Sequence, residues 1–119
     1  MLYTNLKHIE TAAEYTVIIN KNENVMIVCG RMDPVCVPVY RIAEELENAY
    51  KHVKFYDMEF DNPESAILKN VVEYYNLQNI PLVGYFRNGN LMEVSIGIQT
   101  KEQISTILNK EYPKTEQNH

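Results

Sequence analysis

Residues 81–103, PLVGYFRNGNLMEVSIGIQTKEQ, decide the fold. Two apolar runs, Leu82–Phe86 and Leu91–Ile96, flank Arg87–Asn90, and an Asn-Gly pair between such runs is a strong signal for a tight β-hairpin. Thr100-Lys-Glu-Gln103 then has the form of a capping box, which predicts the start of a helix. This part of the chain is therefore predicted to be an antiparallel hairpin followed by a final helix.

Upstream of the hairpin, predicted strands alternate with predicted helices. Apolar and β-prone runs predict strands at Leu2–Leu6, Val25–Val28 and Val53–Phe60. Helical spacing and capping residues predict helices at Ile9–Ile19, at about Val39–Tyr50, and from Pro63 onward with Asn62 as the N-cap. The resulting order βαβαβαββα indicates an α/β fold, with a mixed central sheet and helices on both of its faces.

Length and composition restrict the class of protein. The 119 residues suit one domain, predicted over residues 1–112, with a polar and disordered tail at 113–119. The net charge of −5 disfavours nucleic acid as a partner. The sequence shows no signal-peptide pattern and no membrane-spanning run, so we expect a cytoplasmic protein with reduced thiols and no membrane partner.

The deciding stretch resembles the thioredoxin family. Asn79-Ile80-Pro81-Leu82, Phe86-Arg-Asn-Gly89, Gly97 and the segment from Thr100 are similar to the family pattern I-P-T-x-x-x-F-x-N-G, a later glycine and the last helix. The resemblance extends over about residues 2–110. It implies a thioredoxin fold in which the Ile80–Pro81 bond is cis and faces the active-site loop.

The same resemblance contains a departure at the active site. Aligned on the helix that ends at Tyr50, Cys36 matches the second cysteine of the family's C-G-P-C, and Asp33 holds the place of the first, nucleophilic cysteine. A carboxylate cannot attack a disulfide sulfur. Ile27 stands where the family's strand carries a buried aspartate, and the chain has no tryptophan.

Cys29 and Cys36, the two cysteines of the chain, flank this loop. Cys36 lies near a predicted helix N-terminus, where the dipole favours the thiolate, whereas burial at a strand end is expected to raise the pKa of Cys29. One hypothesis is an atypical thiol–disulfide oxidoreductase that uses both cysteines against protein disulfides, with a thioredoxin-type reductase as electron donor. Two cysteines alone are too few ligands for a metal site, and no cofactor is predicted.

The alternative hypothesis is a non-catalytic module in which both cysteines are core packing. It would bind an extended segment of a partner protein in a groove formed by Ile80, Pro81, Asp33 and Gly97. Two other features of the sequence are assigned no site. The alternating Asp57, Glu59 and Asp61 are predicted to lie on a solvated strand edge, and no catalytic role is predicted for the three histidines, His8, His52 and His119.

Overall fold

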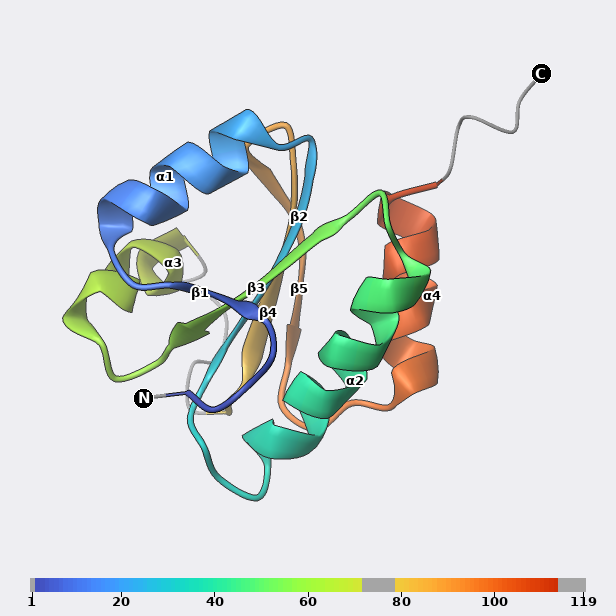
Figure 1. Cartoon of the computed structure of the whole chain (residues 1–119), viewed down its shortest axis with the longest axis horizontal. Helices are drawn as coiled ribbons and strands as arrows, with labels where there is room; N and C mark the ends of the chain where they lie inside the picture. The colour runs from blue at the N-terminus through green and yellow to red at the C-terminus, as the bar shows by residue number, and fades with distance from the viewer. Residues whose placement is uncertain (1, 72–78, 114–119) are drawn as a thin grey trace.

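The computed structural model describes residues 2–71 and 79–113. Its strands are β1 (Lys7–Ile9), β2 (Asn24–Gly30), β3 (Lys54–Glu59), β4 (Leu82–Arg87) and β5 (Asn90–Ile96). Its helices are α1 (Ala12–Lys21), α2 (Cys36–Ala49), the single 3₁₀ turn η1 (Pro63–Ser65), α3 (Ala66–Val71) and α4 (Lys101–Glu111), as Figure 1 shows. Among the described residues, no helix is both long and apolar enough to cross a membrane.

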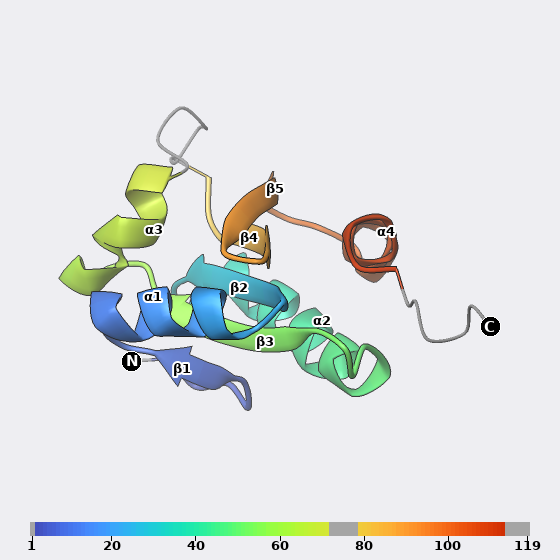
Figure 2. The same ribbon diagram turned by 90° about the horizontal axis from the view of Figure 1, so that it is seen from above.

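One mixed sheet forms the centre of the molecule, with strand order β1-β3-β2-β4-β5. β1, β3 and β2 run parallel, and β4 and β5 run antiparallel to their neighbours. Helices α1 and α3 cover one face, and α2 and α4 cover the other, as the view from above shows (Figure 2). The predicted α/β class and mixed sheet are therefore confirmed.

The central strand β2 separates two hydrophobic layers. Met26 and Val28 point into the layer beneath α2 and α4, together with Cys36 and Tyr40. The alternate side chains, Val25, Ile27 and Cys29, point into the layer beneath α1 and α3. Val25–Gly30 are all buried, which is why this strand appears in the sequence as a continuous apolar run.

The start of the chain differs from the prediction. The predicted strand Leu2–Leu6 is wrong, because β1 covers Lys7–Ile9. The hydroxyl of Thr4 accepts a hydrogen bond from the Leu6 N–H (3.1 Å), and such a local bond competes with pairing in a sheet. Leu2 and Leu6 instead bury their side chains in the layer beneath α2 and α4.

Helix and turn signals mostly act as predicted. Thr100 and Gln103 form the expected capping box, and Asn88 and Gly89 have positive φ angles of 52° and 83° in the hairpin turn. Helix α1 begins at Ala12 rather than at Ile9, because Thr11 and Glu14 form a second capping box. The later part of the third predicted helix, with Val72 and Tyr75, and tail residues 114–119 lie outside the described residues.

Candidate functional site at the end of the central strand

Three segments converge on Gly30, the last residue of β2. A methyl group placed on its Cα would lie 2.8 Å from Cys36 Sγ, 3.0 Å from Pro81 Cβ and 3.1 Å from Tyr40 Oη. Only a residue without a side chain allows these groups to approach the strand so closely. The end of β2, the first turns of α2 and the segment before β4 therefore meet at one place.

Pro81 joins this site to the loop after β5. The Ile80–Pro81 peptide bond is cis. The Pro81 carbonyl accepts a hydrogen bond from the Gly97 N–H at 2.9 Å, and Gly97 has a positive φ of 86°. Pro81 is buried, and Ile80 and Gly97 are partly exposed beside it. Of the predicted group Ile80, Pro81, Asp33 and Gly97, these bonds join Ile80, Pro81 and Gly97.

Asp33 serves as the cap of helix α2. Its Oδ1 accepts hydrogen bonds from the N–H groups of Val35 (3.0 Å) and Cys36 (2.7 Å), and its carbonyl accepts one from the Val37 N–H (3.0 Å). These bonds, led by the one from Cys36, lower the pKa of the Asp33 carboxyl group. A negative charge therefore occupies the helix N-terminus, where a thiolate would otherwise be stabilised.

The thiol of Cys36 interacts with this carboxylate, and the residue is fully buried. Burial raises its pKa to about 11, and the neighbouring Asp33 carboxylate adds to the increase. Arg31 acts in the other direction, mainly through a hydrogen bond from its backbone N–H to the Cys36 thiol, and its guanidinium group pairs with Asp61 through bonds of 2.7 and 2.9 Å. The expectation of a thiolate favoured by the helix dipole is therefore wrong, since burial and the cap dominate.

Cys29 lies on the opposite face of the sheet from Cys36. It packs in the layer beneath α1 and α3, among residues such as Met58 and Leu68. Burial raises its pKa to about 12, although Lys69 acts in the other direction. Both cysteines are free thiols. The structure therefore places them near the same end of β2 but directs their side chains into different layers.

Tyr40 belongs to the site and was not predicted. Its phenol is fully buried, its Oη approaches Gly30 beside Cys36, and it has no hydrogen-bond partner among the described residues. Burial raises the pKa of this phenol, and the nearby Cys36 thiol contributes further. The available signal was its spacing of four residues from Cys36, which places both side chains on one face of a helix.

Asp57 corrects the prediction of a solvated strand edge. Its side chain is fully buried, and burial raises its pKa. It accepts a hydrogen bond from the Thr4 hydroxyl and lies 2.7 Å from His8 Nδ1. A buried carboxylate is therefore present on β3, although Ile27 replaces the one that the family resemblance placed on β2.

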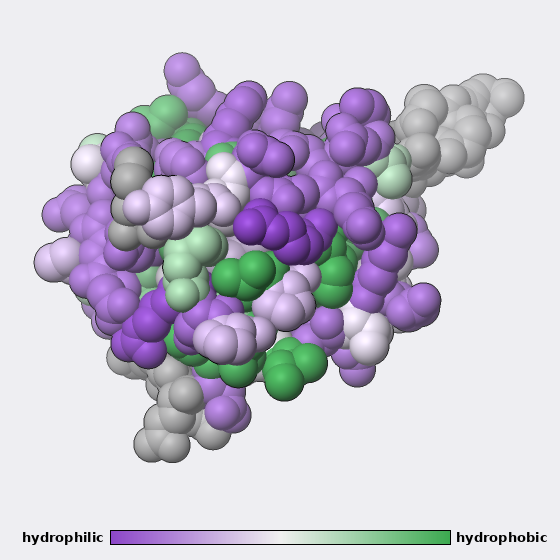
Figure 3. Space-filling model, turned by 60° about the horizontal axis from the view of Figure 1, so that its bottom comes forward, coloured by the Kyte–Doolittle hydropathy of each residue, from purple (hydrophilic) through white to green (hydrophobic). Residues whose placement is uncertain are grey.

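Apolar side chains are exposed around the site. Tyr3, Val35 and Ile98 are 70%, 39% and 77% exposed. Val35 lies in the loop before α2, Ile98 follows Gly97, and the Tyr3 N–H contacts Met32 Sδ in the same loop (3.3 Å). Figure 3 shows hydrophobic side chains gathered in the middle of this face, with hydrophilic ones around them. We call Tyr3, Met32, Val35 and Ile98 the apolar rim.

Comparison with solved structures gives matches over nearly the whole chain. Thioredoxin from Plasmodium falciparum superposes with a TM-score of 0.73 and 21% identity, over 89% of this chain and 99% of its own. Thioredoxin f2 from Chlamydomonas reinhardtii gives a TM-score of 0.76 and 13% identity, over 93% and 100%. The chain has a thioredoxin fold.

A third match to this thioredoxin-fold chain is thioredoxin O2 from Arabidopsis thaliana in the oxidised state. It has a TM-score of 0.71 and 16% identity, over 93% of this chain and 97% of its own. No family model matches the sequence, and no curated protein matches it. The likeness therefore concerns the fold alone.

Proposed function

We propose that this thioredoxin-fold protein is a non-catalytic module that binds an extended segment of a partner protein beside Pro81. The observation that carries this proposal is the state of the helix α2 N-terminus. The Asp33 carboxylate occupies it, and the thiol at the site, Cys36, is buried with a raised pKa. A disulfide exchange enzyme needs an accessible thiolate there.

The surface around Pro81 supports binding of this kind. The apolar rim exposes large side chains whose burial against a partner would be favourable. Ile80 and Gly97 are partly exposed beside Pro81, so an extended segment could approach the backbone there as well as contact side chains. Asp33, with its lowered pKa, contributes a fixed negative charge at one side of this surface.

A phage-displayed library of extended peptides, selected on the purified protein, tests the proposal. Selected peptides are expected to shift the NMR signals of Ile80, Gly97 and Ile98. The Ile98→Asp variant is expected to bind them at least about tenfold more weakly, because it places a charge on the apolar rim. Met92→Asp is the matched control, since Met92 is 49% exposed on β5, outside the rim. Equal losses of peptide affinity in both variants, or a library that yields no binding peptide, would reject the proposal.

Thiol–disulfide exchange by Cys29 and Cys36 is the second candidate. It is favoured by proximity, because Cys29 adjoins Gly30, and a methyl group on Gly30 would lie 2.8 Å from Cys36 Sγ. In this scheme the Cys36 thiolate attacks a protein disulfide and releases one substrate thiol. Cys29 then attacks Cys36 Sγ, releases the second substrate thiol and leaves an intramolecular disulfide, which a thioredoxin-type reductase in the cytoplasm would reduce.

This exchange requires the end of β2 to open, because the two side chains lie in different layers. Rate-resolved alkylation with mass mapping, on reduced and mildly oxidised samples, separates the two candidates. Exchange predicts that Cys36 is alkylated faster than Cys29 and that a Cys29–Cys36 disulfide forms. The binding module predicts that both thiols stay unreactive in the folded protein and that no such disulfide appears.

A further inference from the structure

The segment before β1 reaches the apolar rim at Tyr3. Figure 1 shows this segment beside the loop that joins β2 to α2, where the Tyr3 N–H lies 3.3 Å from Met32 Sδ. Leu2 and Leu6 are buried on either side of it, whereas Tyr3 is 70% exposed. The segment Leu2–Leu6 therefore presents a large aromatic residue at the surface between two buried anchors.

Side chains, rather than backbone pairing, hold this segment in place. Within the described residues, the pairing of β1 with β3 begins only at Lys7. The Asn5 N–H donates a hydrogen bond to Glu44 of α2 (2.6 Å), and the Leu6 N–H donates one to the Thr4 hydroxyl (3.1 Å). A segment outside the sheet opens easily unless other contacts fix it, so its order depends on these few side chains.

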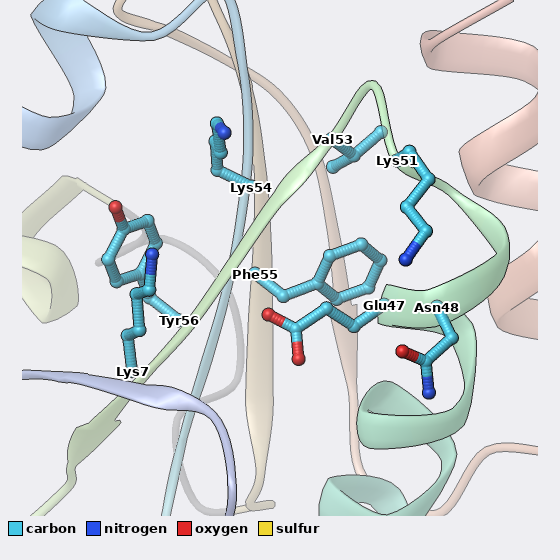
Figure 4. Close-up of a pocket in the computed structure, with 8 residues that line it drawn as sticks. All are labelled: Lys7, Glu47, Asn48, Lys51, Val53, Lys54, Phe55 and Tyr56. Atoms are coloured by element: carbon cyan, nitrogen blue, oxygen red, sulfur yellow. The ribbon is translucent and has the colours of Figure 1, made fainter.

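Thr4 links the segment to the buried carboxyl group of β3. Its hydroxyl donates a hydrogen bond to Asp57 Oδ2, and Asp57 is fully buried. Figure 4, a close-up of the same strand, shows that Phe55 points toward α2 and that Tyr56 points away from it. Asp57 shares the face of Phe55, because alternate residues of a strand point the same way. The carboxyl group therefore lies on the α2 side of the sheet, where the buried residues of the segment also pack.

We propose that Thr4 positions Tyr3 as a specificity-determining contact for the partner segment, a role that rests on the proposed binding beside Pro81. Thr4 is next to Tyr3 in the chain, so its hydrogen bond to Asp57 restricts the backbone that carries the ring. A tyrosine ring has few rotatable bonds and a large contact area, which makes it an effective anchor when its backbone is already ordered. Tyr3 and Met32 together then select a partner segment with a large apolar side chain at this point.

The first test of this positioning role needs no peptide. Thr4→Val keeps the size of the side chain and removes the hydroxyl, whereas Thr4→Ser keeps the hydroxyl. In heteronuclear NOE measurements, Tyr3 is expected to be ordered in the wild-type protein and in Thr4→Ser, and mobile on the picosecond-to-nanosecond timescale in Thr4→Val. Thr16→Val is the matched control, because the Thr16 hydroxyl bonds the Ala12 carbonyl on α1. If Tyr3 stays ordered in Thr4→Val, burial of the flanking leucines is sufficient and the inference is overturned.

The second test uses the peptides selected for binding beside Pro81. Tyr3→Ala and Thr4→Val are each expected to weaken peptide binding at least about tenfold, and Thr4→Ser is expected to bind like the wild-type protein. Adding Thr4→Val to Tyr3→Ala is expected to weaken binding no further, because the effects of coupled residues are not additive. Peptides selected on the Tyr3→Ala variant are expected to lack the large apolar residue that selection on the wild-type protein favours.

The outcomes separate this inference from the proposed function. If Ile98→Asp weakens peptide binding but Tyr3→Ala does not, the binding module stands and the inference is overturned. Additive effects of Thr4→Val and Tyr3→Ala would give Thr4 a structural role only, which also overturns it. A library that yields no binding peptide rejects the proposed function, and the inference falls with it.

Discussion

At the scale of single residues, Asp33 determines the chemistry of the site. It caps α2 from the position before Pro34, in the same Asx-Pro arrangement by which Asn62 caps η1 before Pro63. The capping role could therefore have been inferred from the sequence alone. Helix α2 therefore starts with a carboxylate at its N-terminus.

Replacing Asp33 by cysteine should create a dithiol with Cys36, because the Asp33 carboxylate already interacts with the Cys36 thiol. Under mild oxidation we expect a disulfide between residues 33 and 36, and in the reduced state a new ability to reduce insulin disulfides. Loss of the cap should lower the free energy of unfolding by about 0.5–2 kcal/mol. Asp61→Cys, outside the cap, is the control. A variant in which residue 33 stays alkylatable after oxidation would contradict this prediction.

Gly30→Ala should disrupt the site by overpacking. The added methyl group meets Cys36 Sγ at 2.8 Å and Pro81 Cβ at 3.0 Å, so we expect a loss of about 1–3 kcal/mol in urea unfolding. We also expect faster alkylation of Cys36, because neighbouring side chains must move. Gly97→Ala serves as the comparison, since its φ of 86° strains the backbone while its methyl group would lie 3.9 Å from Asn79 Cβ. Similar alkylation rates in the two variants would argue against the convergence at Gly30.

Some residues of the site are predictable from the sequence and others are not, for a physical reason. Asp33, Cys36, Pro81 and Gly97 lie in local motifs whose spacing is preserved, so the resemblance was sufficient to place them. The roles of Tyr40 and Asp57 depend on which distant segments cover them. Asp57 belongs to an alternating series of acidic residues that is typical of a strand edge, but Thr4 and His8 contact its carboxylate.

At the scale of elements, side-chain hydrogen bonds join β1 to β3 in addition to the short backbone pairing. Its three residues pair with Tyr56–Met58. Thr4 and His8, one before the strand and one within it, both bond the buried Asp57 carboxylate. A buried charge is stable only when hydrogen bonds surround it, so the carboxylate and the N-terminal segment order each other. This mutual dependence explains why a three-residue strand forms at the sheet edge.

His8→Ala should therefore destabilise the fold although His8 is an exposed residue. Removing the imidazole leaves the Asp57 carboxylate with one fewer partner in a buried place, which costs roughly 1–3 kcal/mol. Lys7→Ala on the same strand is the matched control, and a change within about 0.5 kcal/mol is expected there. Urea unfolding of both variants at neutral pH measures the difference. Equal effects would show that Asp57 does not anchor β1 through His8.

Burial also gives Asp57 a predictable effect on stability. Its folded-state pKa is raised, so the folded protein retains the Asp57 proton to higher pH than the unfolded chain does. The free energy of unfolding should then fall as pH rises from about 4, the ordinary aspartate value, through the raised value. Asp57→Asn should remove this decrease. Unfolding of both proteins at a series of pH values tests it, and a difference that stays constant with pH would be contrary to the prediction.

At the scale of the whole molecule, the residue that follows the last helix is bonded to the central sheet, and we call this contact the closure of the fold. The Tyr112 hydroxyl, just after α4, lies 3.0 Å from the Val25 carbonyl and 2.9 Å from the Phe86 carbonyl, and the residue is buried. The Tyr112 carbonyl in turn lies 2.8 Å from His52 Nε2. The order of elements was predictable from periodicity and caps, but this closure was not, because it joins residues far apart in sequence.

Tyr112→Phe should lower the free energy of unfolding by roughly 1–3 kcal/mol, because the one hydroxyl proton that the two buried carbonyl groups share is lost. Tyr50→Phe removes a hydroxyl that bonds Asn109 in an exposed place, and a change of less than about 0.5 kcal/mol is expected. Thermal unfolding followed by circular dichroism compares them. The closure would be energetically unimportant if both variants melted at the wild-type temperature.

The placement of the two thiols in separate layers makes the protein its own reporter of partial unfolding. Cys36, the first residue of α2, points into the layer between the sheet and helices α2 and α4, and Cys29 points into the layer beneath α1 and α3. Under conditions where opening is faster than labelling, the labelling rate of each buried thiol reflects the free energy of the smallest opening that exposes it. Two equal free energies would mean that the layers unfold together. Two unequal ones would rank the layers as separate cooperative units, without any introduced label.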